Sequence, residues 1–180
     1  MFPARKITLA AMFIALGLLL PIAFHGLGLG TVFLPMHIPV LLAGLMAGPG
    51  VGLVVGAAIP GLSSIATGMP PLLPMVPMMT VELAIYGLIA GLLHHSWRKG
   101  LIVSLLGAML AGRVAYGVVG ALFLPLLGIT GISVWGPITY GVVTSWPGLL
   151  VQLVLIPLLV QAVRRAGFLN RPSETRVDTR

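Results

Sequence analysis

Six long apolar stretches restrict what this chain can fold into. Their approximate limits are 7–24, 32–48, 50–67, 76–95, 101–126 and 138–163. A helix needs roughly 20 mainly apolar residues to cross the hydrocarbon core of a membrane. Across the chain 58% of the residues are hydrophobic and 7% are charged, against about 25% charged in soluble domains. Because too few polar side chains are present to cover a water-exposed surface, we predict an all-α, polytopic membrane protein with six transmembrane helices.

Glycine and proline define the connections between these stretches. Residues 48–50 read Gly-Pro-Gly and predict a tight turn. Residues 69–77 contain four prolines, each of which lacks a backbone N–H donor, so we expect a loop there rather than a regular helix. Residues 128–137, which include Trp135, are expected to form another loop. We assign residues 1–167 to one six-helix membrane domain and 168–180 to a polar cytoplasmic tail.

The positions of Lys and Arg predict the orientation in the membrane. They lie near the N-terminus, between the fourth and fifth stretches, and in the C-terminal tail, whereas the other loops carry none. Cytoplasmic loops are enriched in these residues, so we expect both termini in the cytoplasm and the loops near 25–31, 68–76 and 128–137 outside. The net charge of +7 comes from these segments. Since no basic face interleaved with aromatic residues is present, nucleic acid is not an expected partner.

Two permanently charged side chains, Glu82 and Arg113, lie well inside the predicted spans. Placing a charge at the centre of a membrane helix costs about 2.5–3.5 kcal/mol, so such residues normally face the protein interior and have a partner. Counting 1.5 Å per residue from the predicted helix ends puts Glu82 roughly 8 Å and Arg113 roughly 12 Å below the outer surface. We therefore expect both side chains in one layer of the outer half of the membrane.

Other polar and aromatic residues fall at similar depths. The same arithmetic places His37 and Tyr116 at about 8 Å, and Tyr86 and Trp146 at about 13 Å, below the outer surface. The two tyrosines follow the two charged residues by four and three positions, so each shares a helix face with its charged neighbour. The inner half of the spans is, by contrast, almost purely aliphatic.

This polar layer has two interpretations. It is either a pocket open to the outside, in which Arg113, Glu82 and His37 anchor a ligand, or a buried Glu82–Arg113 ion pair that fixes helix packing. Both can hold, because the pair can also orient Arg113 toward an anionic ligand. For His37 alone, packing or hydrogen bonding at a helix end is the alternative to ligand contact.

Methionines crowd the proline-rich loop and the start of the fourth span, where they form either a lid over a ring-shaped ligand or plain apolar filling. They are Met69, Met75, Met78 and Met79. Together with the outer aromatic residues they complete the candidate substrate-binding set. That set is Arg113, Glu82, His37, Tyr86, Tyr116, Trp135, Tyr140, Trp146, Met69 and Met79.

Small residues recur at four-residue spacing, which lets membrane helices approach closely. Ala11 and Ala15 form such a pair on the first span. A second series continues across the second and third spans, and for it we predict internal packing. It consists of Gly44, Gly48, Gly52 and Gly56.

Several catalytic signatures are absent from the sequence. It has no G-x-x-x-x-G-K-[ST] phosphate loop, no H-E-x-x-H pair, no cysteine, and no Asp in any span. His94 and His95 are adjacent, so they point about 100° apart on a helix and make a poor metal pair; we predict an interfacial position for them. We expect neither an enzyme nor a bound metal or cofactor.

Four segments give the chain a family resemblance. They are His37-Ile-Pro-Val-Leu-Leu-Ala-Gly-Leu-Met-Ala-Gly-Pro49, Thr67-Gly-Met-Pro-Pro71, Glu82-Leu-Ala-Ile-Tyr-Gly87 and Gly112-Arg-Val-Ala-Tyr-Gly117. In this order and spacing they resemble the substrate-binding S components of energy-coupling factor (ECF) vitamin transporters. The resemblance covers nearly the whole chain, from the first span to the sixth.

The resemblance implies a function and partners. S components have six helices, lie in the plasma membrane of prokaryotes, and bind a vitamin or vitamin precursor tightly near the outer face. They associate with a membrane coupling (T) subunit and two cytoplasmic ABC ATPases, and are thought to topple so that the pocket turns inward. The family's first helix contacts the coupling subunit through an Ala-x-x-x-Ala motif, which Ala11 and Ala15 match.

The ligand is open at this point. Arg113 would suit a carboxylate or phosphate bound in a bidentate fashion, as in pantothenate, niacin or lipoate. The methionines and aromatic rings would equally suit a flat heterocycle, such as a benzimidazole or pyrimidine precursor. The motifs most resemble members assigned to pantothenate or to cobalamin precursors.

Three other functions are weighed against substrate capture. A solitary transporter or channel would need a polar path through the inner half, and a lipid-modifying intramembrane enzyme would need paired carboxylates or a metal site. A purely structural assembly subunit would leave the outer polar layer without a ligand. The sequence favours the capture subunit over all three.

Overall fold

The computed structural model describes residues 4–26, 33–129, 131 and 133–166, and in this part of the chain the regular structure is entirely helical. The α-helices are α1 (Ala4–Gly26), α3 (His37–Ala47), α4 (Pro49–Thr67), α5 (Met75–Gly91), α6 (Leu101–Phe123) and α7 (Trp135–Arg165). A π-helical turn, η1 (Leu92–Ser96), extends α5, and a 3₁₀ turn, η2 (Leu124–Leu127), extends α6. The predicted tail, 168–180, lies outside the described residues.

Five of these helices are long and apolar enough to cross a membrane, and α3 is shorter. The sequence predicted a full span over 32–48, but the helix begins at His37 and has 11 residues, or about 16 Å at 1.5 Å per residue. Pro35 and Met36 form a turn before it, and Leu34 has a positive φ of 49°. Because proline restricts the preceding residue to non-helical conformations, the helix cannot continue back through Pro35. Pro39 is tolerated because it lies in the first turn, where N–H groups have no partner within the helix.

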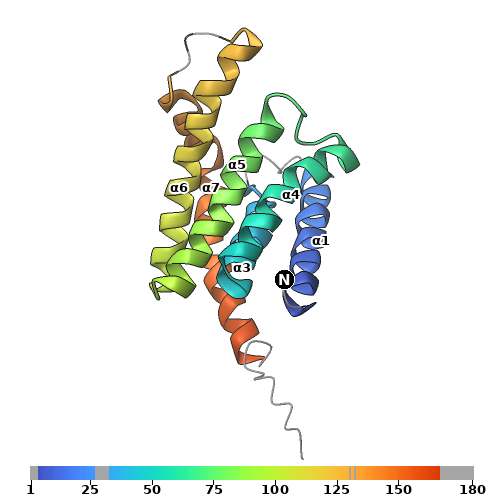
Figure 1. The fold of residues 1–180 in the computed structure, drawn as a ribbon, viewed down its shortest axis with the longest axis vertical. Coiled ribbons are helices and arrows are strands. Elements are labelled where there is room, and N and C mark those ends of the chain that lie inside the picture. Colours follow the sequence, from blue (N-terminus) through green and yellow to red (C-terminus); the bar gives the residue numbers. More distant parts are fainter. Residues whose placement is uncertain (1–3, 27–32, 130, 132, 167–180) are drawn as a thin grey trace, which may run out of the picture.

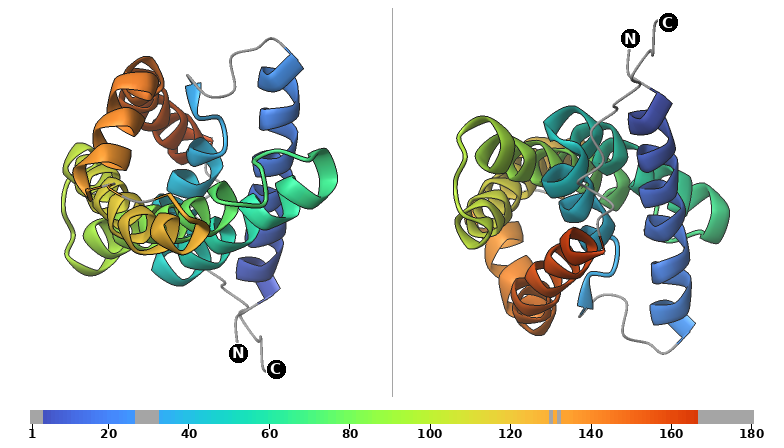
Figure 2. Two further views of the ribbon diagram at one scale, coloured as in Figure 1. Left: turned by 90° about the horizontal axis from the view of Figure 1, so that it is seen from above. Right: turned by 90° about the horizontal axis from the view of Figure 1, so that it is seen from below.

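Helix α3 forms the centre of the bundle. It contacts α1, α4, α5 and α7, and nearly all its residues are buried. Seen along the long axis of the molecule in Figure 2, α3 lies between α1 at one edge and α7 at another. A short helix surrounded by longer ones has its N-terminus within the protein, so groups at that end are enclosed by neighbouring helices.

Glycines allow α3, α4 and α5 to pack closely. A Cβ atom on Gly44 or Gly52 would overlap the carbonyl group of Gly87, and a Cβ on Gly56 would overlap the carbonyl group of Leu83. The expected internal packing of this series is therefore confirmed for these three positions. Gly48 has another role, because it forms the turn between α3 and α4 with a backbone φ of 99°. Pro49 is the first residue of α4.

Helix α7 is longer than predicted and bent. It begins at Trp135 and runs to Arg165, so the expected loop over 128–137 was wrong in its last residues. Ser145 has non-helical backbone angles (φ −112°, ψ 15°). Pro147 explains the bend, because it has no N–H group to donate to the carbonyl of Val143. The bend places Ser145 against α6.

The connections lie alternately at the two ends of the bundle (Figure 1). The first residues of α1, the α3–α4 turn, the α5–α6 connection and the end of α7 lie at the lower end in this view, and the α4–α5 loop lies at the upper end. The chain therefore passes up and down the bundle, and the described Lys and Arg residues other than Arg113 lie on segments toward the lower end. Residues 68–74 between α4 and α5 are non-helical, as their prolines predicted, but α5 begins at Met75. The expected loop over 69–77 was therefore wrong in its last three residues, because Pro77 lies in the first turn of α5, where a missing N–H group costs no helical hydrogen bond.

Candidate ligand-binding site

A cavity of about 210 Å³ lies among α3, α5, α6, α7 and the α4–α5 loop. The segment before α3 and the loop contribute mainly apolar side chains. The helices contribute the polar ones. Its walls are formed by Leu34, Pro35, Met36, His37, Met69, Pro70, Pro71, Met75, Met79, Glu82, Arg113, Tyr116, Gly141, Thr144 and Ser145.

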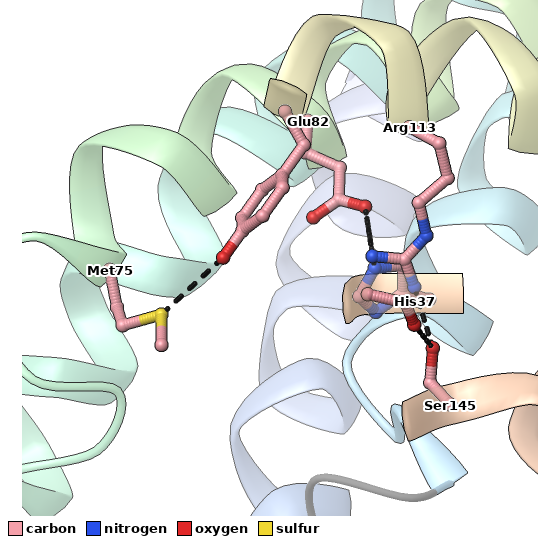
Figure 3. A network of polar contacts seen from close by, with 7 residues as sticks. His37, Met75, Glu82, Arg113 and Ser145 are labelled. Atoms are coloured by element: carbon pink, nitrogen blue, oxygen red, sulfur yellow. Dashed lines mark hydrogen bonds and ion pairs between the residues drawn. The ribbon is translucent and has the colours of Figure 1, made fainter. Parts of the chain in front are cut away.

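A buried ion pair forms part of the cavity wall. Arg113 Nη1 lies 3.0 Å from Glu82 Oε1, and Glu82 and Arg113 are only 1% and 7% exposed. The other terminal nitrogen, Arg113 Nη2, donates a hydrogen bond of 2.9 Å to Ser145 Oγ. Figure 3 shows the guanidinium group between the carboxylate of Glu82 and the hydroxyl of Ser145. The pair joins α5 to α6, and the serine joins both to α7.

The bend in α7 holds the serine in place. Ser145 Oγ donates to the carbonyl oxygen of Gly141 and accepts from Arg113. Serine hydroxyls that bond to the carbonyl four residues earlier often bend helices, which agrees with the non-helical angles at this position. A Cβ atom on Gly141 would lie 2.8 Å from Arg113 Nη1. The absence of a side chain at Gly141 therefore makes room for the guanidinium group.

His37 lies beside the ion pair at the start of α3. Its Nε2 atom is 3.8 Å from Glu82 Oε1, and neither ring nitrogen has a hydrogen-bond partner among the described residues. The ring packs edge-on against Tyr86, with the ring centroids 5.0 Å apart. Gly112 leaves space for Tyr86, because a Cβ there would overlap the phenol ring. A buried imidazole usually finds a hydrogen-bond partner, so its two unpartnered nitrogens are notable beside a cavity.

Methionines form much of the remaining wall. Met36, Met69, Met75 and Met79 all line the cavity, and the hydroxyl of Tyr116 lies 3.5 Å from Met75 Sδ. Thioether side chains are polarizable and make favourable contacts with aromatic rings. The cavity therefore combines a polar, buried side with a soft, apolar one.

The structure brings together most of the predicted candidates, but not all of them. Tyr86 lies behind His37 rather than on the cavity wall. Trp135 and Trp146 are both exposed and do not line this cavity. The side chain of Tyr140 lies outside the described part of the structure.

Three residues of α7 were missed by sequence reasoning: Gly141, Thr144 and Ser145 all line the cavity. Serine, threonine and glycine are common in membrane helices, so the identity of these residues alone did not indicate a binding site. The proximity of Pro147 would have been a usable clue, since proline bends helices and exposes nearby backbone carbonyls.

A further polar residue of α7 was also missed. Gln152 is fully buried, and neither atom of its amide has a hydrogen-bond partner among the described residues. It follows Ser145 by seven residues, so it lies on the same helix face and roughly 10 Å further along α7. A buried polar side chain therefore lies in the part of the bundle that the sequence predicted to be almost purely aliphatic.

The two adjacent histidines lie at the opposite end of the molecule from the cavity. His94 Nε2 is 2.7 Å from Arg164 Nη2, and His95 Nε2 is 2.8 Å from the carbonyl oxygen of Leu45. These contacts connect η1 to the ends of α7 and α3. In the described part of the chain, no group of three His, Cys, Asp or Glu side chains is arranged to hold a metal ion.

The bundle and its cavity define a multi-pass helical membrane protein with an internal site for a small molecule. A comparison with protein families matches residues 5–167 to the substrate-specific component of ECF transporters. The chain belongs to this family of substrate-binding transporter subunits, which are not enzymes. A search of curated proteins and a search of solved structures each found no significant match.

Proposed function

We propose that this chain captures a vitamin or vitamin precursor in the cavity beside His37, Glu82 and Arg113. The observation that carries the proposal is a cavity of about 210 Å³ next to a buried ion pair and an imidazole that has no hydrogen-bond partner in the described part of the chain. Small-molecule sites are typically concave and mostly apolar, with a few convergent polar groups. An ion pair that served packing alone would be expected among close-packed side chains, without a cavity of this size beside it.

The direction of capture follows from the distribution of charge. The cavity lies toward the end of the bundle that carries the α4–α5 loop, and the described Lys and Arg residues outside the cavity lie toward the other end (Figure 1). The excess of these residues in cytoplasmic loops supports a cavity that opens to the outside. Both termini would then be cytoplasmic, in the plasma membrane of a prokaryote.

Release would depend on partners. The chain has no phosphate-binding loop, so the energy for import would come from two cytoplasmic ABC ATPases acting through a membrane coupling subunit. Ala11 and Ala15 are both exposed on α1, whereas Phe13 and Gly17 on the same helix are buried. A small-residue face that is not used for internal packing supports contact between α1 and the coupling subunit.

Two ligand classes fit the sequence expectations. Pantothenate would place a carboxylate near Arg113, and a cobalamin precursor such as a benzimidazole would place a flat ring between the methionines. We retain both as candidate ligands of this cavity.

Native mass spectrometry of the full chain tests capture directly. The protein is expressed in rich medium, purified in mild detergent, and sprayed under conditions that keep tight complexes intact. We expect a bound small molecule of one defined mass. Empty protein that also shows no change in melting temperature with a panel of vitamins and precursors would contradict the proposal.

A further inference from the structure

The permanent charges of the described residues around the cavity sum to zero. Of the described residues that line it, Glu82 and Arg113 carry permanent charge, and they neutralise each other across 3.0 Å. We infer that the captured ligand is an uncharged, flat nitrogen heterocycle of one or two rings, with a hydrogen-bond donor next to an acceptor. This inference rests on the proposed capture function and specifies the class of substrate.

An anion would fit this charge arrangement poorly. The arginine that would attract it is already paired with Glu82 and bonded to Ser145, so the anion would lie beside a carboxylate of the same sign. A cation near Glu82 would likewise lie beside the guanidinium group. An unpaired charge in a buried site of low dielectric is strongly unfavourable, and breaking the existing pair would leave one of its members unpaired instead.

An uncharged ligand would use both members of the pair. The Glu82 carboxylate accepts hydrogen bonds and the Arg113 guanidinium donates them, and the two groups lie side by side on the same wall. The two ring nitrogens of His37 add further hydrogen-bonding positions, and both are without partners among the described residues. A matching ligand edge carries an N–H group that donates to Glu82. Beside it lies a ring nitrogen or carbonyl oxygen that accepts from Arg113.

The size and lining of the cavity set the shape of the ligand. An apolar protein cavity of about 150 Å³ holds a benzene molecule, so the 210 Å³ here suits one ring with substituents or two fused rings. Four methionines contribute to the wall, and thioether groups pack favourably on aromatic rings. Of the two candidate classes, these features favour the benzimidazole type over pantothenate, whose carboxylate is charged at neutral pH.

The charge of the captured molecule tests the inference. The full chain in detergent is incubated at pH 7.4 with the small-molecule fraction of yeast extract, washed, and denatured. The released compound is identified by mass spectrometry, and its electrophoretic mobility is measured at the same pH. We expect an aromatic heterocycle with zero mobility. A charged compound, or one without an aromatic ring, would overturn the inference but leave capture intact, whereas the release of no compound would argue against capture itself.

Two charge-removing variants give a second test with the released compound as the probe. For an uncharged ligand, Glu82→Gln should weaken binding at least about tenfold and Arg113→Gln roughly 30-fold or more by calorimetry, because each replaces a charged hydrogen-bonding group by a neutral amide and leaves the other member of the ion pair unpaired. Tighter binding to Glu82→Gln would reveal an anionic ligand, and tighter binding to Arg113→Gln a cationic one; either result overturns the inference. Gel filtration checks that each variant is folded. If one variant is not folded, the electrophoretic mobility of the released compound alone tests the inference.

Discussion

Arg113 is held at the cavity by polar contacts to two other helices, α5 and α7. It is paired with Glu82, bonded to Ser145, and given space by Gly141. A charge inside a membrane is stable only when such partners compensate for the loss of water. The same arrangement fixes the direction of the guanidinium group, which is what a ligand-binding residue requires.

Replacing Arg113 by Gln should weaken ligand binding by about 2 kcal/mol or more, roughly 30-fold, because a charged donor is lost and Glu82 is left unpaired. Isothermal titration with the captured compound measures the change. Arg164→Gln is the matched control, since Arg164 lies at the other end of α7 beside His94 and should leave affinity unchanged. Wild-type affinity in a folded Arg113→Gln protein would reduce Arg113 to a packing role.

Gln152 presents the opposite case, a buried polar group without partners among the described residues. Leaving such a group unsatisfied costs about 1–3 kcal/mol. We therefore expect Gln152→Leu to stabilise the protein by about 1 kcal/mol or more, measured by thermal unfolding in detergent. Gln161→Leu on the exposed part of α7 is the control and should change little. A lower stability of Gln152→Leu would show that the amide has a partner in the folded protein.

At the scale of elements, glycine and proline decide how the helices fit together. The glycines of α3, α4 and α5 let backbones meet without side chains between them, which is a common way for membrane helices to gain packing energy. Pro35 prevents α3 from starting before the residues that follow it, and Pro147 bends α7 near Ser145. These two distortions bring His37 and Ser145 to the same cavity.

Gly56 and Gly61 on α4 provide a matched test of this packing. A Cβ on Gly56 would overlap the backbone of Leu83, whereas nothing lies within 4 Å of a Cβ on Gly61. Gly56→Ala should lower the free energy of unfolding by about 1–3 kcal/mol or more, because backbone cannot move aside as a side chain can. Gly61→Ala should be neutral or slightly stabilising. Equal effects of the two substitutions would contradict the close approach of α4 and α5.

At the scale of the whole molecule, the proposed binding site and the proposed coupling face lie on different helices. The cavity is built from α3, α5, α6 and α7, whereas α1 lies at the periphery and packs against α3 and α4 (Figure 2). Phe13 and Gly17 face inward, and Ala11 and Ala15 are exposed. Changes on the outer face of α1 should therefore leave the cavity intact.

The double substitution Ala11→Trp, Ala15→Trp should preserve ligand affinity but abolish uptake, because bulky side chains would prevent close contact with the coupling subunit. Uptake of the labelled ligand by cells containing the complete transporter measures this. Leu106→Trp with Leu110→Trp is the control, since both residues are exposed at the same spacing on α6. Unimpaired uptake by the α1 variant would mean that another face contacts the coupling subunit.

Much of the architecture was accessible from the sequence. The apolar stretches predicted the helices, residues 48–50 predicted the turn, and the depth count placed Glu82 and Arg113 in the same layer, where the structure joins them. These predictions succeeded because hydropathy, backbone restriction by proline, and the rise of a helix are local properties. The family resemblance rests on the same ordered motifs, and the match over residues 5–167 confirms it.

The sequence by itself thus determined that this is a helical membrane protein of this family. It also determined that few charged residues lie within the helices. Only the tertiary structure decided that α3 is short, that Trp135 and Trp146 do not line the cavity, and that Gly141 and Ser145 meet Arg113. The physical reason is that periodicity gives the depth of a side chain but not the rotation of its helix about its own axis. That rotation is set by contacts between helices distant in sequence, and it determines which side chains share a cavity.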